Sequence, residues 1–437
     1  MNKFLSAFIM ILLSGLPVNA ELIIHEVKSK GGITAWLVSD NSIPIISFDI
    51  AFKGGASTEL DDKLGATYLM AGLLEEGAGN MDATAFSLAA EELATSLSFN
   101  SSRERISISA EFLKETTNQS IALLKAAITQ PAFNDAAFER TKAQVLSIIS
   151  RNQTDPRKIA SNAFNKIAFE SHPYGRPYQG TANTISSLTQ DDMFEAHRQN
   201  LTKDRLFVSV VGDITADELL IILDDLFGGL PEKGALFPDV INFKASGGNT
   251  IIDFDTTQST ALWGHSGISQ NDPDFFAAFV MNHILGGGSF TSRLTDEVRE
   301  KRGLTYGVYS YIANMDYANF YGGSVSSAND RIEEALDVIK EEWARMANSG
   351  VTEEELIAAK KYITGSYPLR FDGNGQIAGI LTYSQTNDFP INYPQNRNSY
   401  VEAVTKKDIA RVANRILKAE DIHFVVVGSP TGLVATE

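Results

Sequence analysis

Residues 189–212 read TQDDMFEAHRQNLTKDRLFVSVVG, and residues 405–428 read TKKDIARVANRILKAEDIHFVVVG. In both stretches the first Thr is followed, 23 residues later, by a Gly that ends a short apolar β-type run. The second stretch begins 216 residues after the first. Solenoid repeats are only about 20–50 residues long. The spacing therefore indicates a duplicated domain of a little over 200 residues.

A second pair of segments supports the duplication. Residues 133–142 and residues 351–360 match at an offset of 218, within two residues of the first. Each begins with an N-cap signal, and in the second copy Thr352 and Glu355 have the spacing of a capping box. Two independent matches at nearly the same offset favour duplication over coincidence.

The periodicity within each copy predicts an α+β fold. Residues 47–52 alternate apolar and polar positions, whereas residues 207–211 and 424–427 are short runs rich in Val. Helical periods are predicted over residues 85–97, 117–128, 135–151, 331–346 and 353–362. Residues 231–248 lack a helical period and contain Pro and Gly. We therefore predict a first domain over 21–230, a linker over 231–248 and a second domain over 249–437.

The N-terminal residues 1–20 have the pattern of a signal peptide. Lys3 gives a positive start, residues 4–16 are apolar, and Val18 and Ala20 are small residues at the −3 and −1 positions of a cleavage site. The apolar run is shorter than the roughly 20 residues needed to cross a bilayer. We predict cleavage after Ala20 and a periplasmic protein; a buried N-terminal helix is the alternative.

Composition excludes several classes of function. The 437-residue chain has 37 Lys and Arg against 54 Asp and Glu, for a net charge of −17, which argues against a nucleic-acid partner. It has no cysteine, and so no disulfide, thiolate zinc site or cysteine nucleophile. No stretch after residue 20 is long and apolar enough to suggest membrane insertion.

The residues suited to catalysis form no local site. The six histidines lie at least 18 residues apart, so no pair has the one-turn spacing of a helical zinc site. No Gly-x-Ser-x-Gly elbow is present. The run Gly286-Gly287-Gly288-Ser289 lacks the Lys of a phosphate loop and predicts a flexible turn at a helix end.

Residues 290–308, FTSRLTDEVREKRGLTYGV, resemble the pitrilysin/insulinase family of zinc peptidases, in the branch of the mitochondrial processing peptidases and their bacterial relatives. Further matching segments are 171–174 (SHPY), 180–181 (GT), 284–288 (ILGGG) and 355–360 (ELIAAK). The resemblance covers nearly the whole mature chain. It implies two homologous tandem domains, each a mostly antiparallel sheet packed with several helices, that face each other across a cleft.

The same resemblance implies a substrate-binding site in the second domain. Arg299 and Tyr306 have the seven-residue spacing of the family's pair that binds substrate backbone. Gly286, Gly287 and Gly288 correspond to a glycine-rich loop that shapes the substrate passage. The alternatives are an ion pair of Arg299 with Asp296 or Glu300, a packed Tyr306, and a plain glycine turn.

The first domain departs from the family's catalytic pattern. Active members carry His-x-x-Glu-His on a helix, where two His and a downstream Glu hold zinc and the inner Glu activates water. Matched on the flanking glycines, these positions are Tyr68, Ala71 and Gly72, and the downstream ligand falls near Ile148 or Ile149. The resemblance therefore implies no zinc ligands in this chain.

The combined pattern predicts a non-catalytic, substrate-binding subunit of an exported heterodimeric zinc metallopeptidase that acts on peptides or unfolded protein segments. Zinc is expected in the partner, a homologous catalytic subunit that bears His-x-x-Glu-His. One alternative is a structural or peptide-binding protein of the same fold with no role in proteolysis. Another is an autonomous peptidase with unusual ligands, which would hold zinc as a single chain.

Overall fold

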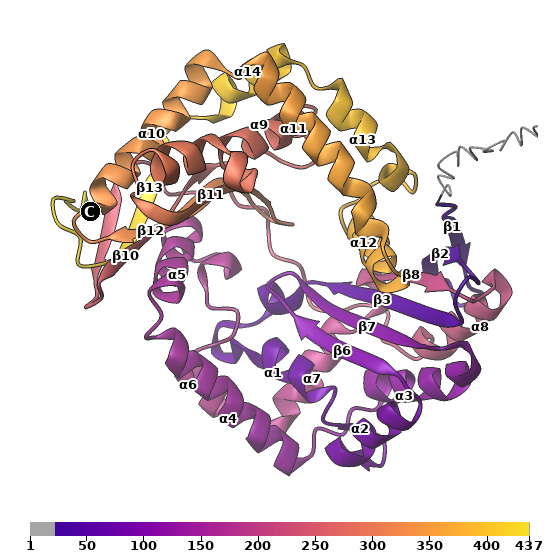
Figure 1. Cartoon of the computed structure of the whole chain (residues 1–437). Coiled ribbons are helices and arrows are strands. Elements are labelled where there is room, and N and C mark those ends of the chain that lie inside the picture. Colours follow the sequence, from indigo (N-terminus) through magenta and orange to yellow (C-terminus); the bar gives the residue numbers. More distant parts are fainter. Residues whose placement is uncertain (1–21, 437) are drawn as a thin grey trace, which may run out of the picture.

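The computed structural model describes residues 22–436 (Figure 1). The predicted signal peptide and its cleavage site lie outside the described residues. Among residues 22–436 no helix has both the length and the apolar character needed to cross a membrane.

The N-terminal half forms a six-stranded sheet in the order β1-β2-β8-β3-β7-β6. Its pairs are antiparallel except for β2 and β8, which run parallel. The strands are β1 His25–Lys28, β2 Thr34–Ser39, β3 Ile45–Lys53, β6 Ser96–Ser101, β7 Arg105–Leu113 and β8 Leu206–Gly212. A short hairpin of β4 Gly77–Ala78 and β5 Met81–Asp82 lies apart from this sheet.

The C-terminal half repeats this topology. Its strands are β9 Asn249–Asp253, β10 Gln258–Ser266, β11 Thr305–Asn314, β12 Asn319–Ala328 and β13 His423–Gly428. The order β9-β13-β10-β12-β11 matches β2-β8-β3-β7-β6 of the first sheet, and β9 and β13 are again the parallel pair. The α+β fold with a duplicated, mostly antiparallel sheet is thus confirmed. The cleft between the halves stays a prediction, as do the domain bounds.

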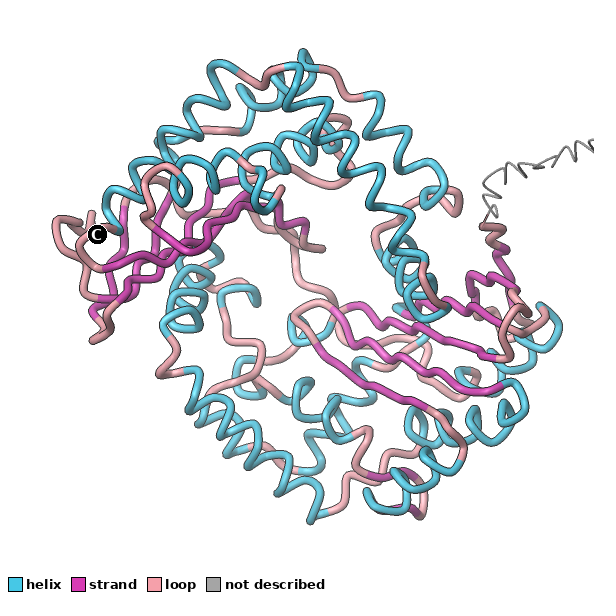
Figure 2. The backbone as a smooth tube through the Cα atoms, viewed as in Figure 1, coloured by secondary structure: helices cyan, strands magenta, loops and turns pink. Residues whose placement is uncertain are grey.

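Most helices of each half lie on one side of its sheet (Figure 2). The helices of the first half of the chain are α1 Ala66–Leu73, α2 Ala83–Glu92, α3 Thr117–Thr129, α4 Asp135–Asn152, α5 Pro156–Phe169, α6 Ala182–Ser187, α7 Gln190–Asn200 and α8 Ala216–Phe227. Those of the second half are α9 Phe275–Asn282, α10 Ile332–Ser349, α11 Glu353–Ser366, α12 Asn374–Thr386, α13 Tyr393–Ala403 and α14 Lys406–Ile416.

The predicted helices are confirmed with one correction, and the capping box of Thr352 and Glu355 forms as expected. The helix predicted over residues 85–97 ends at Glu92, because residues 96–101 form the edge strand β6. Ala94, with φ 48°, breaks the helix between the two elements. The apolar residues of this stretch fit either periodicity, so the sequence alone placed the boundary wrongly.

The two halves exchange one helix each. Helix α12 covers the first sheet, where Thr382 Oγ1 lies within hydrogen-bond distance of the Asp49 carbonyl oxygen (3.1 Å) and Ser209 Oγ (2.9 Å). Helix α5 covers the second sheet, where Phe164 packs in a buried cluster with Val425 and Val427. Phe424 and Val426 alternate with these residues along β13 and belong to the core on the other face of the sheet. Strands β8 and β13 are therefore buried on both faces, which explains their continuous apolar sequence.

Candidate functional site

Tyr68, Ala71 and Gly72 lie together on α1, beside α4. Helix α1 follows Gly65, whose φ of 89° is left-handed, and one carboxylate binds two backbone N–H groups at the start of the helix. Glu59 accepts hydrogen bonds from the Gly65 N–H (2.8 Å) and the Thr67 N–H (2.6 Å). The sequence therefore builds the helix that carries the family's metal motif, with a remote acidic cap.

The side chains on this helix do not fit a metal ion. Tyr68 is half-buried, and its ring meets Tyr178 edge-on at 5.9 Å between centroids. Ala71 is buried, and a Cβ on Gly72 would lie 3.5 Å from Thr141 of α4. Tyr68 and Gly72 thus put a phenol and a hydrogen atom where the family has two imidazoles, and Ala71 puts a methyl group where it has a carboxylate. Because Zn²⁺ in proteins is bound by Cys, His, Asp or Glu, these side chains are not zinc ligands.

No other ligands gather at this place. Ile149, near the position of the downstream ligand, is in the hydrophobic core. Glu75 accepts a hydrogen bond from the Phe99 N–H (2.9 Å), and Glu76 forms an ion pair with Arg140, so both carboxylates after α1 have other partners. Within residues 22–436, no group of three His, Asp or Glu side chains could hold a metal ion.

The segment around His172 joins the two halves. The Tyr174 hydroxyl donates to the Glu104 carboxylate and accepts a hydrogen bond from the Tyr317 N–H (3.0 Å). Glu104 also accepts from the Asp316 N–H (2.7 Å). Burial raises the pKa of Glu104. His172 accepts a hydrogen bond from the Tyr174 N–H at Nδ1 (3.2 Å), so this histidine stabilises its own turn.

Arg299 and Tyr306 lie on either side of the turn that leads into β11. Arg299 belongs to the π-helical turn Thr295–Glu300; its guanidinium lies 5.0 Å from the centre of the exposed Phe290 ring and its Nε 3.4 Å from the Glu300 carboxylate. The alternative contact with Glu300 is therefore present. The alternative of a packed Tyr306 is wrong, because this side chain is 89% exposed.

The exposure of Tyr306 has a local cause. Strand β11 is an edge strand, and its pairing with β12 is irregular between Thr305 and Val308. Thr305 Oγ1 stabilises this bulge by accepting a hydrogen bond from the Gly307 N–H (3.0 Å). Bulges redirect side chains at sheet edges. This one leaves the phenol without a packing role inside the chain.

The glycine-rich run packs against the same strand. Gly286 and Gly287 end the π-helical turn His283–Gly287. A Cβ on Gly286 would lie 2.4 Å from Ser310 Oγ and 2.8 Å from the Ser310 nitrogen. A Cβ on Gly288 would lie 2.5 Å from the His283 carbonyl oxygen. Gly286 is therefore required for close backbone approach to β11, and Gly288 for close approach to His283 within its own turn.

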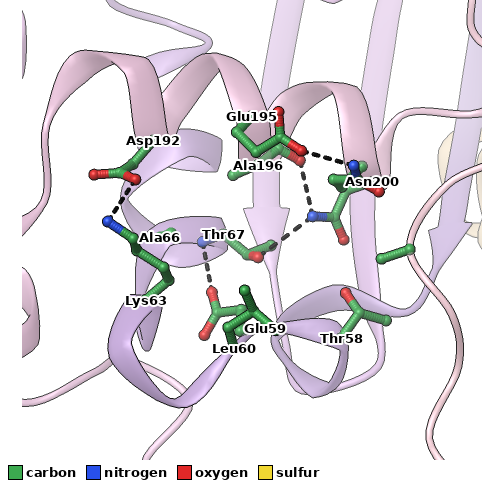
Figure 3. A pocket seen from close by; sticks show the side chains of 12 residues that line it. Thr58, Glu59, Leu60, Lys63, Ala66, Thr67, Asp192, Glu195, Ala196 and Asn200 are labelled. Atoms are coloured by element: carbon green, nitrogen blue, oxygen red, sulfur yellow. Dashed lines mark hydrogen bonds and ion pairs between the residues drawn. The ribbon is translucent and has the colours of Figure 1, made fainter.

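A cavity of about 290 Å³ beside α1 was missed by the sequence reasoning (Figure 3). Glu59 lies in its wall, and burial raises the pKa of this carboxyl to about 7. Lys63 and Asp192 form an ion pair of 2.8 Å across it. The only sequence signal was an acidic residue ahead of a Gly that begins a helix, which is too common to single out.

Two models of protein families match the chain. A family model described as "Insulinase (Peptidase family M16)" matches residues 35–182, and one described as "Peptidase M16 inactive domain" matches residues 187–363. The two matches follow one another along the chain, and the short helix α6, Ala182–Ser187, lies where the first ends and the second begins.

Relatives of similar length agree. The chain is 26% identical to a protein of Helicobacter pylori named "Non-peptidase homolog YmxG", over 98% of this chain and 99% of that one. It is 26% identical to the "Probable mitochondrial-processing peptidase subunit beta" of Schizosaccharomyces pombe, over 88% and 87%. A crystal structure titled "peptidase M16 inactive domain" from Pseudomonas fluorescens superposes with a TM-score of 0.88, at 26% identity and over 95% and 99%. The chain belongs to the M16 (pitrilysin/insulinase) peptidase family, as a member without the catalytic zinc motif.

Proposed function

We propose that this chain is the non-catalytic, substrate-binding subunit of an exported heterodimeric zinc metallopeptidase. The observation that carries the proposal is a combination of loss and retention. The positions of the metal motif hold Tyr68, Ala71 and Gly72, while Arg299 and Tyr306 keep the spacing of the family's substrate-binding pair and the Tyr306 side chain is 89% exposed. Its relatives include a protein named as a non-peptidase homolog and one named as a probable peptidase subunit.

The chemistry of the pair suits a peptide backbone. The Arg299 guanidinium donates charge-assisted hydrogen bonds, which peptide carbonyl oxygens accept. The Tyr306 hydroxyl is a donor that can stabilise the oxyanion developing at a carbonyl attacked in a partner's site. Strand β11 is an edge strand, and extended peptides bind to sheet edges through main-chain hydrogen bonds.

The partner would supply what α1 lacks. A homologous chain with His-x-x-Glu-His would hold zinc and activate the attacking water. This chain would contribute binding and orientation of the substrate, a peptide or an unfolded protein segment, in the periplasm. Cleavage itself would take place at the zinc of the partner.

Native purification of the tagged mature chain from the periplasm tests the proposal. A co-eluting protein of similar size with the zinc motif, identified by mass, is the expected result. A chain that elutes alone or with itself, without zinc, would replace the proposal with a structural or peptide-binding role. Stoichiometric zinc in the single chain would instead indicate an autonomous peptidase.

The reconstituted pair then tests the two residues. Tyr306→Phe should lower kcat/KM about 100-fold or more, as the loss of one oxyanion donor does. Tyr309→Phe is the matched control, because Tyr309 lies on the same strand and is 53% exposed. Arg299→Ala should raise KM. Equal activity of the Tyr306 and Tyr309 variants would remove Tyr306 from the proposed site.

A further inference from the structure

Two neighbouring cavities lie among α9, α11, α12 and α13, helices that Figure 1 shows at the top and right of the molecule. Their volumes are about 300 and 170 Å³. They share the lining residues Phe279, Tyr367, Arg370 and Arg397, and neither is lined by any Asp or Glu. In a chain with 54 acidic and 37 basic residues, a cavity with two arginines and no carboxylate is an unusual environment.

Arg397 of α13 is held rigidly between the cavities. The side chain is 8% exposed, and its guanidinium lies 4.5 Å from the ring centre of Tyr367 and 5.2 Å from that of Phe279. Its Nη1 donates hydrogen bonds to the Ile363 carbonyl (3.3 Å) and Asn398 Oδ1 (3.2 Å). Burial lowers the pKa of Arg397, but an arginine stays protonated in proteins.

The other edge of this guanidinium has no hydrogen-bond partner among the described residues. Within residues 22–436, no group accepts a hydrogen bond from Nε or Nη2 of Arg397, and no carboxylate forms an ion pair with it. Neither atom is sealed from solvent. Buried charges are normally paired, because desolvation of an isolated charge is costly. The Nε and Nη2 edge is the side of arginine that binds a carboxylate through two parallel hydrogen bonds.

Further groups surround this edge. Arg370, on the 3-10 turn Tyr367–Phe371, is exposed, lines both cavities and forms no ion pair with a described residue. Phe275 and Phe276 add aromatic surface to the smaller cavity. Gly287 and Gly288 form part of the wall of the larger one, so the glycine-rich run borders this site.

We propose that these cavities bind a carboxylate attached to an aromatic or apolar group, as at the C-terminal end of a peptide. Arg397 takes the carboxylate through Nε and Nη2, Arg370 adds a second positive charge, and the phenylalanines take the side chain. A volume near 300 Å³ is at the low end for ligand sites and fits a single residue. The assignment to a peptide rests on the proposed function; the affinity for a carboxylate does not.

Calorimetry on the isolated full-length mature chain tests this site. The probe is N-acetylphenylalanine, and its amide is the control with the same shape and no charge. The acid should bind, and the amide should bind at least about 10-fold more weakly. A peptide ending in Phe with a free C-terminus should likewise bind better than the same peptide amidated. An amide that binds as tightly as the acid would overturn the proposal.

Substitutions locate the binding. Arg397→Gln should weaken binding of the acid by about 10-fold or more, and Arg370→Gln by several-fold. Arg198→Gln is the matched control, since Arg198 is exposed and lines neither cavity. If Arg397→Gln does not fold, the exposed Arg370 carries the test. Unchanged affinity in Arg370→Gln and in every folded Arg397 variant, or competition by inorganic phosphate at equal concentration, would refute a carboxylate site.

The two proposals fail separately. Binding of the probe needs no partner chain, so its failure leaves the subunit proposal standing. Equally, a chain that elutes alone can still bind the acid and not the amide. In the reconstituted peptidase, Arg370→Gln should raise KM for substrates with a free C-terminus and leave kcat unchanged.

Discussion

The exchange of α5 and α12 between the halves predicts strong coupling between Phe164 and Gly264. Phe164 is 3% exposed, and its ring contacts those of Phe243 and Phe320 at 5.7 and 5.6 Å between centroids. A Cβ on Gly264 of β10 would lie 2.7 Å from Phe164 Cζ and 3.2 Å from the Tyr321 carbonyl oxygen. An alanine at 264 therefore requires the phenylalanine ring to move.

The magnitudes follow from these contacts. Phe164→Ala should lower the free energy of unfolding by about 3–5 kcal/mol, as truncation of a buried phenylalanine does. Gly264→Ala alone should cost about 1–3 kcal/mol through overpacking. Once the ring of Phe164 is gone, the same methyl group meets little resistance. Alanine also loses less backbone entropy than glycine in a strand, by roughly 0.5–1 kcal/mol. The double variant should thus be at least as stable as Phe164→Ala.

Urea unfolding followed by tryptophan fluorescence measures this coupling, because Trp263 and Trp343 are fully buried in the second core. The expected interaction energy is about 1–3 kcal/mol in favour of the double variant. Gly365→Ala on α11 is the control, since nothing lies within 4 Å of a Cβ there. Its effect should add to that of Phe164→Ala. Additive costs for the Gly264 pair would refute the packing of α5 against β10.

Three further variants test particular contacts. The free energy of unfolding of the native chain should fall by up to about 3 kcal/mol between about pH 4.5 and 7, because the raised pKa of Glu59 makes the folded chain bind a proton that the unfolded chain has lost. Glu59→Gln should lose this pH dependence in urea titrations. A difference in stability between the variant and the native chain that does not change with pH would contradict the prediction. Arg293→Met should lower the free energy of unfolding by about 3 kcal/mol in chemical denaturation, because loss of the bidentate pair with Glu355 (2.6 and 2.7 Å) leaves the Glu355 carboxylate without its arginine. The additional change Glu355→Met should restore part of the lost stability. Gly286→Ala should lower stability by about 1–3 kcal/mol through its clash with Ser310, and a change in the melting temperature of less than 1 °C would show that the loop yields.

Much of the site could be placed from the sequence, because its parts are local. The spacing of Arg299 and Tyr306 spans one turn and the start of one strand, so the resemblance could name both residues from the sequence, and their role in substrate binding stays a prediction. The environment of each could not be obtained in this way. Tyr306 is exposed because a bulge interrupts the pairing of β11 with β12, and the register of a strand depends on its neighbour.

Contacts between distant segments were beyond the sequence for a different reason. The free edge of Arg397 is defined by Tyr367, Phe279 and Ile363, which belong to three other segments of the chain. One sequence records which residues are present but not which of them desolvate one another. The cavity beside α1 is of the same kind.

The sequence by itself determined the duplication, the α+β class and the absence of the His-x-x-Glu-His motif, since each depends on residue types at fixed spacing. It also showed that residues 207–211 and 424–427, apart from Ser209, are apolar on both faces of a strand. Only the tertiary structure decided what covers the second face. A helix from the opposite half covers each of β8 and β13, because each sheet must bury its remaining apolar face and its own helices already cover the other one.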